Sequence, residues 1–134
     1  IVGISFMAAE AEKAAAKLAQ DGIDAEIVDL RSIKPWDRET VMQSARKTGC
    51  VIVADPGWRT AGAAAEIAAE IGEQAFQELR APVVRVTLPD APAPTTQAEE
   101  ERYYPGAKEI ATAARALLEP RGQRRAAKAM RGTA

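Results

Sequence analysis

Short apolar runs alternate with longer stretches of helical pattern, and this alternation most constrains the fold. Four runs have the apolar character of buried strands: residues 1–5, 24–30, 50–54 and 82–88. Four stretches have helical periodicity: residues 8–20, 38–48, 61–79 and 107–118. Strands joined through helices pair in parallel with right-handed crossovers. The sequence therefore predicts a three-layer α/β/α fold around a doubly wound, mainly parallel sheet of strand order 2-1-3-4.

Local signals support several of these boundaries. Asp37 is a good N-cap for the helix over residues 38–48, and Gly49 ends that helix. In the alanine-rich stretch 61–79, one set of side chains is spaced to form a single buried stripe: Ile67, Ile71, Ala75 and Leu79.

The residue types that most active sites need are scarce. The 134 residues include no histidine and one cysteine, Cys50. The chain therefore lacks the commonest general base and metal ligand, and it cannot form an internal disulfide or a cysteine-based zinc site. We expect no catalytic, cofactor-binding or metal-binding residue in this segment. A single cysteine fits a reducing compartment, either the cytoplasm of a bacterial-type cell or another such compartment, and Cys50 is expected to be a small core residue.

Charge divides the chain in two. Residues 1–118 carry 13 basic and 18 acidic side chains, a net charge of −5, whereas residues 119–134 carry five basic side chains and Glu119, a net of +4. We expect a folded domain over 1–118 and a basic tail over 119–134. The tail could bind nucleic acid or an acidic partner, but it has no aromatic side chain for base stacking, so a solvated end is preferred. No apolar stretch is long enough to span a membrane.

The third apolar run leads directly into the most informative segment, Asp55-Pro56-Gly57-Trp58-Arg59-Thr60-Ala61-Gly62. Pro56 and Gly57 predict a turn, and in an open α/β sheet the loop after a strand usually carries the binding residues. One interpretation has Trp58 cover the edge of the core while Asp55 or Thr60 caps the next helix. The other has the N-terminus of that helix bind an anion, assisted by Arg59.

Further candidates lie in other loops. Asp29 and Arg31, at the end of the second run, are expected to pair across the crevice or to cap the next helix. Trp36 follows a proline and needs a surface to cover its ring. Glu66 is expected to be half-buried among alanines, either as a helix-surface carboxylate or as an interface group.

The segment after the fourth run is rich in proline. Residues 89–96 include three prolines and Asp90, and a loop of this length in a small domain is usually functional or an interface arm. Glu99, Glu100 and Glu101 suggest a solvated acidic turn. Aromatic side chains in loops, such as Tyr103 and Tyr104, indicate an interface with another domain or subunit.

Three motifs in this order resemble the C-terminal domain of transketolase-like enzymes. The resemblance is closest to the β subunit of the thiamine-diphosphate-dependent E1 component of 2-oxo acid dehydrogenase complexes, of the pyruvate or branched-chain type. Residues 23–37, IDAEIVDLRSIKPWD, look like G-I-x-A-E-V-I-D-L-R-T-L-x-P-L-D. Gly57-Trp58-Arg59-Thr60-Ala61-Gly62, with Ala65-Glu66-Ile67, looks like the family's E-G-W-x-x-G-x-G-A-E-I. Val83-Val84-Arg85-Val86, followed by Asp90, Pro92, Pro94 and Tyr104-Pro105, looks like P-V-x-R-V-x-x-x-D-x-P-x-P. The resemblance covers residues 1 to 118.

The chain also departs from this family. Asp55-Pro56 stands where the family often has His-Glu or Glu-Glu, and the basic stretch after Leu118 has no counterpart. The family's N-terminal half, with the pyrimidine side of the thiamine site and a catalytic histidine, has no match here, so we expect the segment to be truncated at its N-terminus.

The resemblance implies a non-catalytic interface and assembly domain. The parent oxidoreductase would decarboxylate a 2-oxo acid and pass the acyl group to the lipoyl group of E2, a disulfide acceptor. Thiamine diphosphate and Mg would bind outside this segment. The implied partners are the E1 α subunit, a second β subunit and the E2 subunit-binding domain.

We assign ten residues as interface candidates: Asp29, Arg31, Trp36, Asp55, Trp58, Arg59, Glu66, Asp90, Tyr103 and Tyr104. Two alternatives stay open. One is the C-terminal domain of a single-chain transketolase or a deoxyxylulose-phosphate-synthase-like enzyme. The other is a stand-alone flavodoxin-like binding module.

Overall fold

The computed structural model describes residues 1–119, so the predicted basic tail falls almost wholly outside the described residues. Four parallel strands form one sheet in the order β2-β1-β3-β4, as predicted. The strands are β1 (Val2–Ile4), β2 (Val28–Leu30), β3 (Ile52–Trp58) and β4 (Val84–Leu88). Val2 lies opposite Val28 on one side and Val53 on the other, which places β1 inside the sheet.

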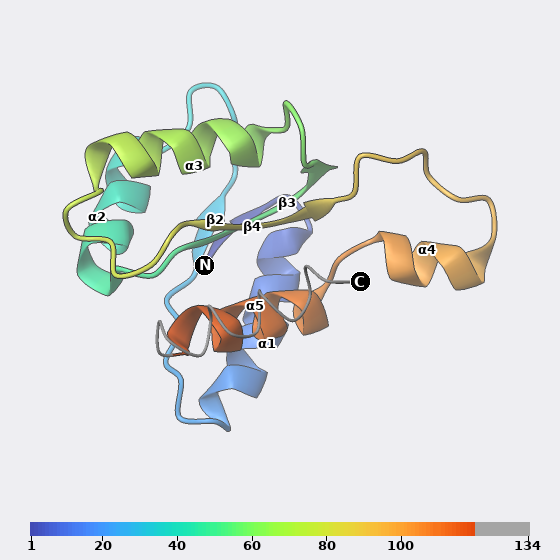
Figure 1. Ribbon diagram of the computed structural model, residues 1–134, viewed down its shortest axis with the longest axis horizontal. Helices are drawn as coiled ribbons and strands as arrows, with labels where there is room; N and C mark the ends of the chain where they lie inside the picture. Colours follow the sequence, from blue (N-terminus) through green and yellow to red (C-terminus); the bar gives the residue numbers. More distant parts are fainter. Residues whose placement is uncertain (120–134) are drawn as a thin grey trace, which may run out of the picture.

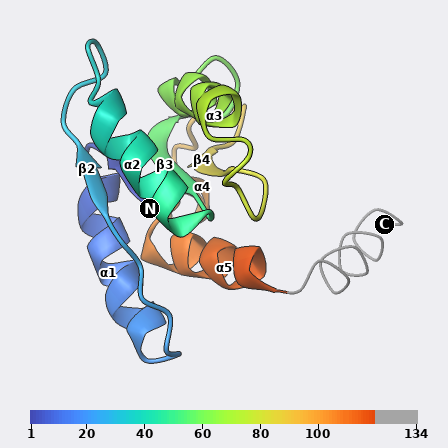
Figure 2. The same ribbon diagram turned by 90° about the vertical axis from the view of Figure 1, so that its left-hand side faces the viewer.

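Helices cover both faces of the sheet, which confirms the three-layer prediction (Figures 1 and 2). One face carries α1 (Met7–Ala19) and α5 (Ala107–Leu118), and the other carries α2 (Arg38–Thr48) and α3 (Ala63–Gln74). A short additional helix, α4 (Gln97–Tyr103), lies beside the sheet in Figure 1.

Each helical layer has its own apolar core. Ile67 and Ile71 of α3 pack with Val41 of α2 against one face of the sheet. Leu18 of α1 and Ile110 of α5 pack against the other face. Helices bury β1 and β3 on both faces of the sheet, so successive residues of these strands are mostly apolar and form continuous apolar runs in the sequence.

Capping residues explain the sharpest boundaries. Asp37 accepts a hydrogen bond from the backbone N–H of Thr40 (3.1 Å), so it is the predicted N-cap of α2. Gly49 ends this helix in the left-handed region, with a φ of 64°, a conformation that favours glycine.

The clearest differences from the sequence prediction concern four elements. β3 does not turn at Pro56 but continues to Trp58. β2 is shorter than predicted, beginning at Val28. α3 ends at Gln74, so Leu79 is half-buried beyond its end rather than on it. The acidic residues 99–101 lie in α4 rather than in a turn.

The extension of β3 has a specific cause. Pairing with β4 breaks after Ala54, opposite Val86, and resumes at Trp58, opposite Leu88. Pro56 lacks an N–H and cannot pair in a ladder, and a bulge lets the strand pass it and pair again.

Within residues 1–119, no helix is both long enough and apolar enough to cross a membrane.

Candidate interface at the carboxyl edge of the sheet

The carboxyl edge, where the four strands end, collects most of the candidate residues. The centre of this edge is Asp55, which is only 4 % exposed and lies in the bulge of β3. Its Oδ1 accepts a hydrogen bond from the N–H of Gly57 (2.8 Å), and its Oδ2 accepts one from the N–H of Ala64 in the first turn of α3 (2.9 Å). Asp55 therefore caps α3 from the preceding strand, as the first interpretation, which offered Asp55 or Thr60 as the cap, predicted.

This cap decides between the two interpretations of the helix N-terminus. A free helix N-terminus attracts anions because its first N–H groups and the helix dipole point outward. Here the buried carboxylate of Asp55 already lies at that position. The prediction that this terminus binds an external anion with Arg59 is wrong, because a second anion would meet the charge of Asp55.

The backbone between β3 and α3 is tightly folded. A Cβ atom added at Gly62 would lie 2.2 Å from the carbonyl oxygen of Trp58, so only glycine fits there. The preceding residue, Ala61, has a φ of 58°. Ser5, at the end of β1, has a φ of 55°. Within residues 1–119, both non-glycine residues in the left-handed region thus lie at the carboxyl edge. Backbone strain of this kind tends to gather at functional sites.

Thr60 does not cap α3 but joins this segment to the loop after β4. Its N–H and its hydroxyl both donate to the carboxylate of Asp90, at 2.9 and 2.7 Å. The hydroxyl bond, together with the backbone bond, holds the pKa of the Asp90 carboxyl below its ordinary value of 3.8. The nearby charges of Arg59 and Arg85 act in the same direction.

A second set of bonds holds the proline loop, residues 89–96. The hydroxyl of Tyr103 donates to the carbonyl oxygen of Ala91 (2.6 Å) and accepts from the indole Nε1–H of Trp58 (3.3 Å). Tyr103 is buried, and its ring meets that of Tyr104 edge-on, with the ring centroids 5.1 Å apart. The proline loop is therefore an ordered part of this edge.

These contacts leave a shallow hollow of about 590 Å³, the Trp58 hollow, lined by Trp58, Thr60, Asp90, Ala91 and Pro92. Trp58 is 60 % exposed, so it does not cover the core edge as the structural interpretation predicted. Phe6 and Tyr104 are also exposed. Aromatic side chains exposed in this way are typical of protein interfaces.

A separate groove of about 490 Å³ lies between the loop before α2 and the first turns of α3. Trp36 lines it and is partly covered by the core, with the guanidinium of Arg38 5.8 Å from its ring centroid. Arg38 also pairs with Glu70 (2.8 Å). Glu66 lines the same groove but is exposed, so the prediction of half-burial is wrong: the position faces solvent rather than the alanine-packed side of α3.

In the described part of the chain, residues 1–119, Asp29 and Arg31 pair only with each other. The Nε of Arg31 lies 2.9 Å from Oδ2 of Asp29, and both side chains are exposed. The predicted alternatives, pairing across the crevice or capping α2, do not occur, because Asp37 already caps that helix.

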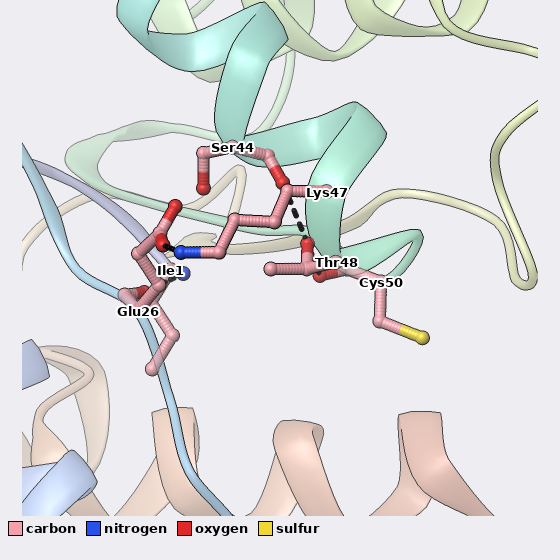
Figure 3. Close-up of polar contacts among 6 residues, drawn as sticks. All are labelled: Ile1, Glu26, Ser44, Lys47, Thr48 and Cys50. Atoms are coloured by element: carbon pink, nitrogen blue, oxygen red, sulfur yellow. Dashed lines mark hydrogen bonds and ion pairs between the residues drawn. The ribbon is translucent and has the colours of Figure 1, made fainter.

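Figure 3 shows the opposite edge of the sheet, where the polar contacts are structural. Lys47 of α2 forms an ion pair with Glu26, and this contact lowers the pKa of Glu26 and raises that of Lys47. The hydroxyl of Thr48 donates to the carbonyl oxygens of Ser44 and Cys50. Cys50 is half-buried against the α1/α5 core, close to its predicted role.

The structure thus gathers Asp55, Trp58, Arg59, Asp90 and Tyr103 in one region, and it leaves Asp29, Trp36 and Glu66 outside it. Whether any of them contacts a partner stays a prediction. Asp55 and Tyr103 are buried within the chain, so their direct role is to hold exposed neighbours. Sequence reasoning missed the bond between Thr60 and Asp90, since 30 residues separate the partners.

Comparison with known proteins gives a consistent result. The family described as "Transketolase, C-terminal domain" matches residues 1–110. The chain is 43 % identical over 119 residues to the pyruvate dehydrogenase E1 component subunit beta of Bacillus subtilis, covering 89 % of this chain and 36 % of the relative. It is 41 % identical over 100 residues to the 2-oxoisovalerate dehydrogenase subunit beta of Pseudomonas aeruginosa, covering 75 % of this chain and 28 % of that relative.

A solved structure supports the fold independently. The chain matches a protein titled "Split gene transketolase, inactive beta4 tetramer" with a TM-score of 0.72 and 35 % identity, over 87 % of this chain and 38 % of that one. The chain therefore spans about a third of the length of the relatives that it matches.

Proposed function

Because the chain belongs to the transketolase C-terminal domain family, we propose that it is the C-terminal domain of a thiamine-diphosphate-dependent 2-oxo acid dehydrogenase E1 β subunit. Its role there is to form interfaces and to support assembly. The observation that carries this proposal is the identity with E1 β subunits, which extends through most of the chain. The domain comprises residues 1–118, and the basic residues 119–134 are an addition to it.

The exposed aromatic side chains at the carboxyl edge support an interface role. Trp58, Phe6 and Tyr104 present apolar surface to solvent in the isolated chain. The proposed partners are the E1 α subunit, a second β subunit and the E2 subunit-binding domain. A net charge of −5 over residues 1–118 suits a basic partner surface such as that of E2.

The parent enzyme would oxidatively decarboxylate a 2-oxo acid and transfer the acyl group to lipoyl-E2. The described residues do not fit thiamine diphosphate or its Mg²⁺. Within residues 1–119, no cluster of three or more His, Cys, Asp or Glu side chains is arranged to hold a metal ion. The N-terminus of α3, a natural place for a phosphate, holds Asp55. The proposal therefore assigns both groups to other parts of the enzyme.

Reconstitution tests this function. The native polypeptide that contains this segment would be co-expressed with a tagged E1 α subunit and mixed with lipoyl-E2. We expect the two polypeptides to co-purify and to acylate the lipoyl domain when a 2-oxo acid is supplied. Residues 1–118 alone serve as the control and should show no decarboxylation. Turnover without an α partner, or tight binding of thiamine diphosphate by residues 1–118 alone, would contradict the proposal.

The split-gene transketolase match favours a second candidate, the C-terminal domain of a transketolase. A transfer assay between two sugar phosphates separates the candidates, because an E1 enzyme has no such activity. Identity with the two β subunits described above is higher, at 43 % and 41 % against 35 %, which supports the first candidate.

A further inference from the structure

The indole of Trp58 is exposed but held in place. Its Nε1–H donates to the hydroxyl of Tyr103, and that hydroxyl is itself fixed by its bond to the carbonyl oxygen of Ala91. The polar atom of the indole is therefore satisfied, while 60 % of the residue remains exposed. Such a ring offers apolar and π-electron surface, and it loses little conformational freedom when a partner binds.

A carboxylate lies in the same hollow. Asp90 lines the Trp58 hollow, and both of its oxygens accept from Thr60. Each oxygen keeps a second lone-pair direction for another donor. Among residues 1–119, no cationic group lies within ion-pair distance of Asp90.

The two nearest arginines are engaged elsewhere. Nη1 of Arg85 donates to the carbonyl oxygen of Arg59 (2.8 Å), and Nη1 of Arg59 reaches the carbonyl oxygen of Arg85 (3.4 Å). Both cations lower the pKa of Asp90 through space, but their guanidinium groups do not pair with it directly. The carboxylate in the hollow is thus charged and open to an outside donor.

An aromatic face beside a carboxylate is a preferred binding site for a cation. A cation between the two groups is attracted both by the ring quadrupole and by the charge of the carboxylate. Arginine suits this position best, because its planar guanidinium can stack on the ring and donate two hydrogen bonds to a carboxylate. We propose that the Trp58 hollow binds an arginine side chain from a basic segment of a partner polypeptide. The guanidinium lies against Trp58 and donates to Asp90. This inference rests on the proposed interface function, to which it adds the chemistry of the partner.

Charge and shape favour this occupant over the alternatives. Asp90 lines the hollow itself, whereas Arg59 and Arg85 do not line it and donate to backbone carbonyl oxygens, so an anionic segment in the hollow would meet the Asp90 carboxylate. A purely apolar side chain would cover Trp58 but would leave the Asp90 carboxylate desolvated and unpaired, which is costly. Ala91 and Pro92 add apolar surface for the methylene stem of the arginine.

The test uses the chain labelled with ¹⁵N-tryptophan, whose two indole signals report on separate places. The probe is a capped pentapeptide of sequence GLRLG, and the control peptide is GLQLG, in which glutamine replaces arginine. We expect GLRLG to shift the Trp58 signal saturably and to leave the Trp36 signal in place. GLQLG should bind about fivefold more weakly, since it lacks the cation–π and ionic contacts.

Three variants refine the test. Asp90→Asn keeps an acceptor for Thr60 but removes the charge, and should weaken GLRLG binding about threefold or more. Tyr103→Phe removes the bond that holds the indole, and should also weaken binding. Glu66→Gln removes an exposed carboxylate in the other groove and should bind like the parent chain.

Equal affinity for GLRLG and GLQLG, or the same affinity in Asp90→Asn as in Glu66→Gln, would overturn the inference. A Trp58 signal that moves with protein concentration alone would also overturn it, since a second copy would then fill the hollow. Co-purification with the E1 α subunit gives an independent result. If that assembly forms but GLRLG does not bind, the inference fails while the proposed function stands.

Discussion

At the scale of single residues, the buried carboxylate of Asp55 links two elements of the fold. A buried carboxylate is stable only when donors surround it, and here two backbone N–H groups from different elements do so. The same side chain ties the bulge of β3 to the start of α3. Its loss would leave the N–H of Ala64, in a buried position, without its partner.

We therefore expect Asp55→Ala to lower the free energy of unfolding by about 2–3 kcal/mol. Asp55→Asn keeps an acceptor oxygen and should cost less. The matched control is Asp37→Ala, which removes the exposed cap of α2 and should cost about 1 kcal/mol. Urea unfolding of the three variants measures the differences. A cost for Asp55→Ala no larger than that for Asp37→Ala would refute the role of burial.

The bond between Thr60 and Asp90 makes a prediction about pH. Thr60→Val removes the hydroxyl bond, the largest cause of the lowered pKa, so the pKa of Asp90 should rise toward 3.8. A lowered folded-state pKa gives stability that is present above about pH 4 and is lost as the pH falls through that pKa. Thr60→Val should therefore reduce the part of the acid-induced loss of stability that comes from Asp90. NMR titration of the Asp90 carboxyl carbon measures the pKa, and an unchanged value would count against the bond.

At the scale of elements, the sequence predicts a boundary well where a local signal sets it. Asp37 and Gly49 delimit α2, and both act as predicted. Among the residues that the structure describes, no side chain caps α4: the hydroxyl of Thr96, at its N-cap, donates to the side chain of Glu99 (2.7 Å) and caps no backbone N–H. The run of acidic residues therefore suggested a turn rather than a helix. The extension of β3 could not be read locally, because it depends on pairing with β4, more than 25 residues away.

Substitution by alanine should have opposite effects on stability at Gly62, the N-cap of α3, and at Gly72, inside the helix. Gly62→Ala places a Cβ against the carbonyl oxygen of Trp58 and should destabilise the chain by about 3 kcal/mol. Gly72 lies inside α3 with no atom within 4 Å of an added Cβ, so Gly72→Ala should stabilise by about 0.5–1 kcal/mol. Thermal and urea unfolding compare them, and a neutral Gly62→Ala would contradict the close approach.

At the scale of the whole molecule, α5 joins the end of the described chain to its beginning. The N–H of Ala107 donates to the carboxylate of Glu10 in α1 (2.9 Å), and Arg115 pairs with Asp21 just after α1 (2.6 Å). These contacts span more than 90 residues of sequence. Sequence patterns predicted both helices but not the contacts between them, because no local pattern in one segment indicates which distant segment it packs against.

The packing of α5 makes the fourth prediction. Ile110 is fully buried in the α1/α5 core, whereas Leu118, at the end of the same helix, is 47 % exposed. Ile110→Ala should lower the free energy of unfolding by about 3 kcal/mol, since it removes buried methyl groups and leaves a cavity. Leu118→Ala is the control and should change stability by no more than about 0.5 kcal/mol. Equal effects in denaturant unfolding would show that α5 does not anchor this core.

The carboxylate of Asp55 at the N-terminus of α3 has a consequence for how the domain responds to its surroundings. A fold that fills such a terminus with a metabolite gains stability as the metabolite becomes abundant and loses it in scarcity. In this domain the anion at that terminus is the carboxylate of Asp55, which belongs to the chain itself, so its occupancy does not depend on the concentration of a ligand. The stability of that terminus therefore does not depend on the phosphate and nucleotide levels of the cell, which suits the interface role proposed above.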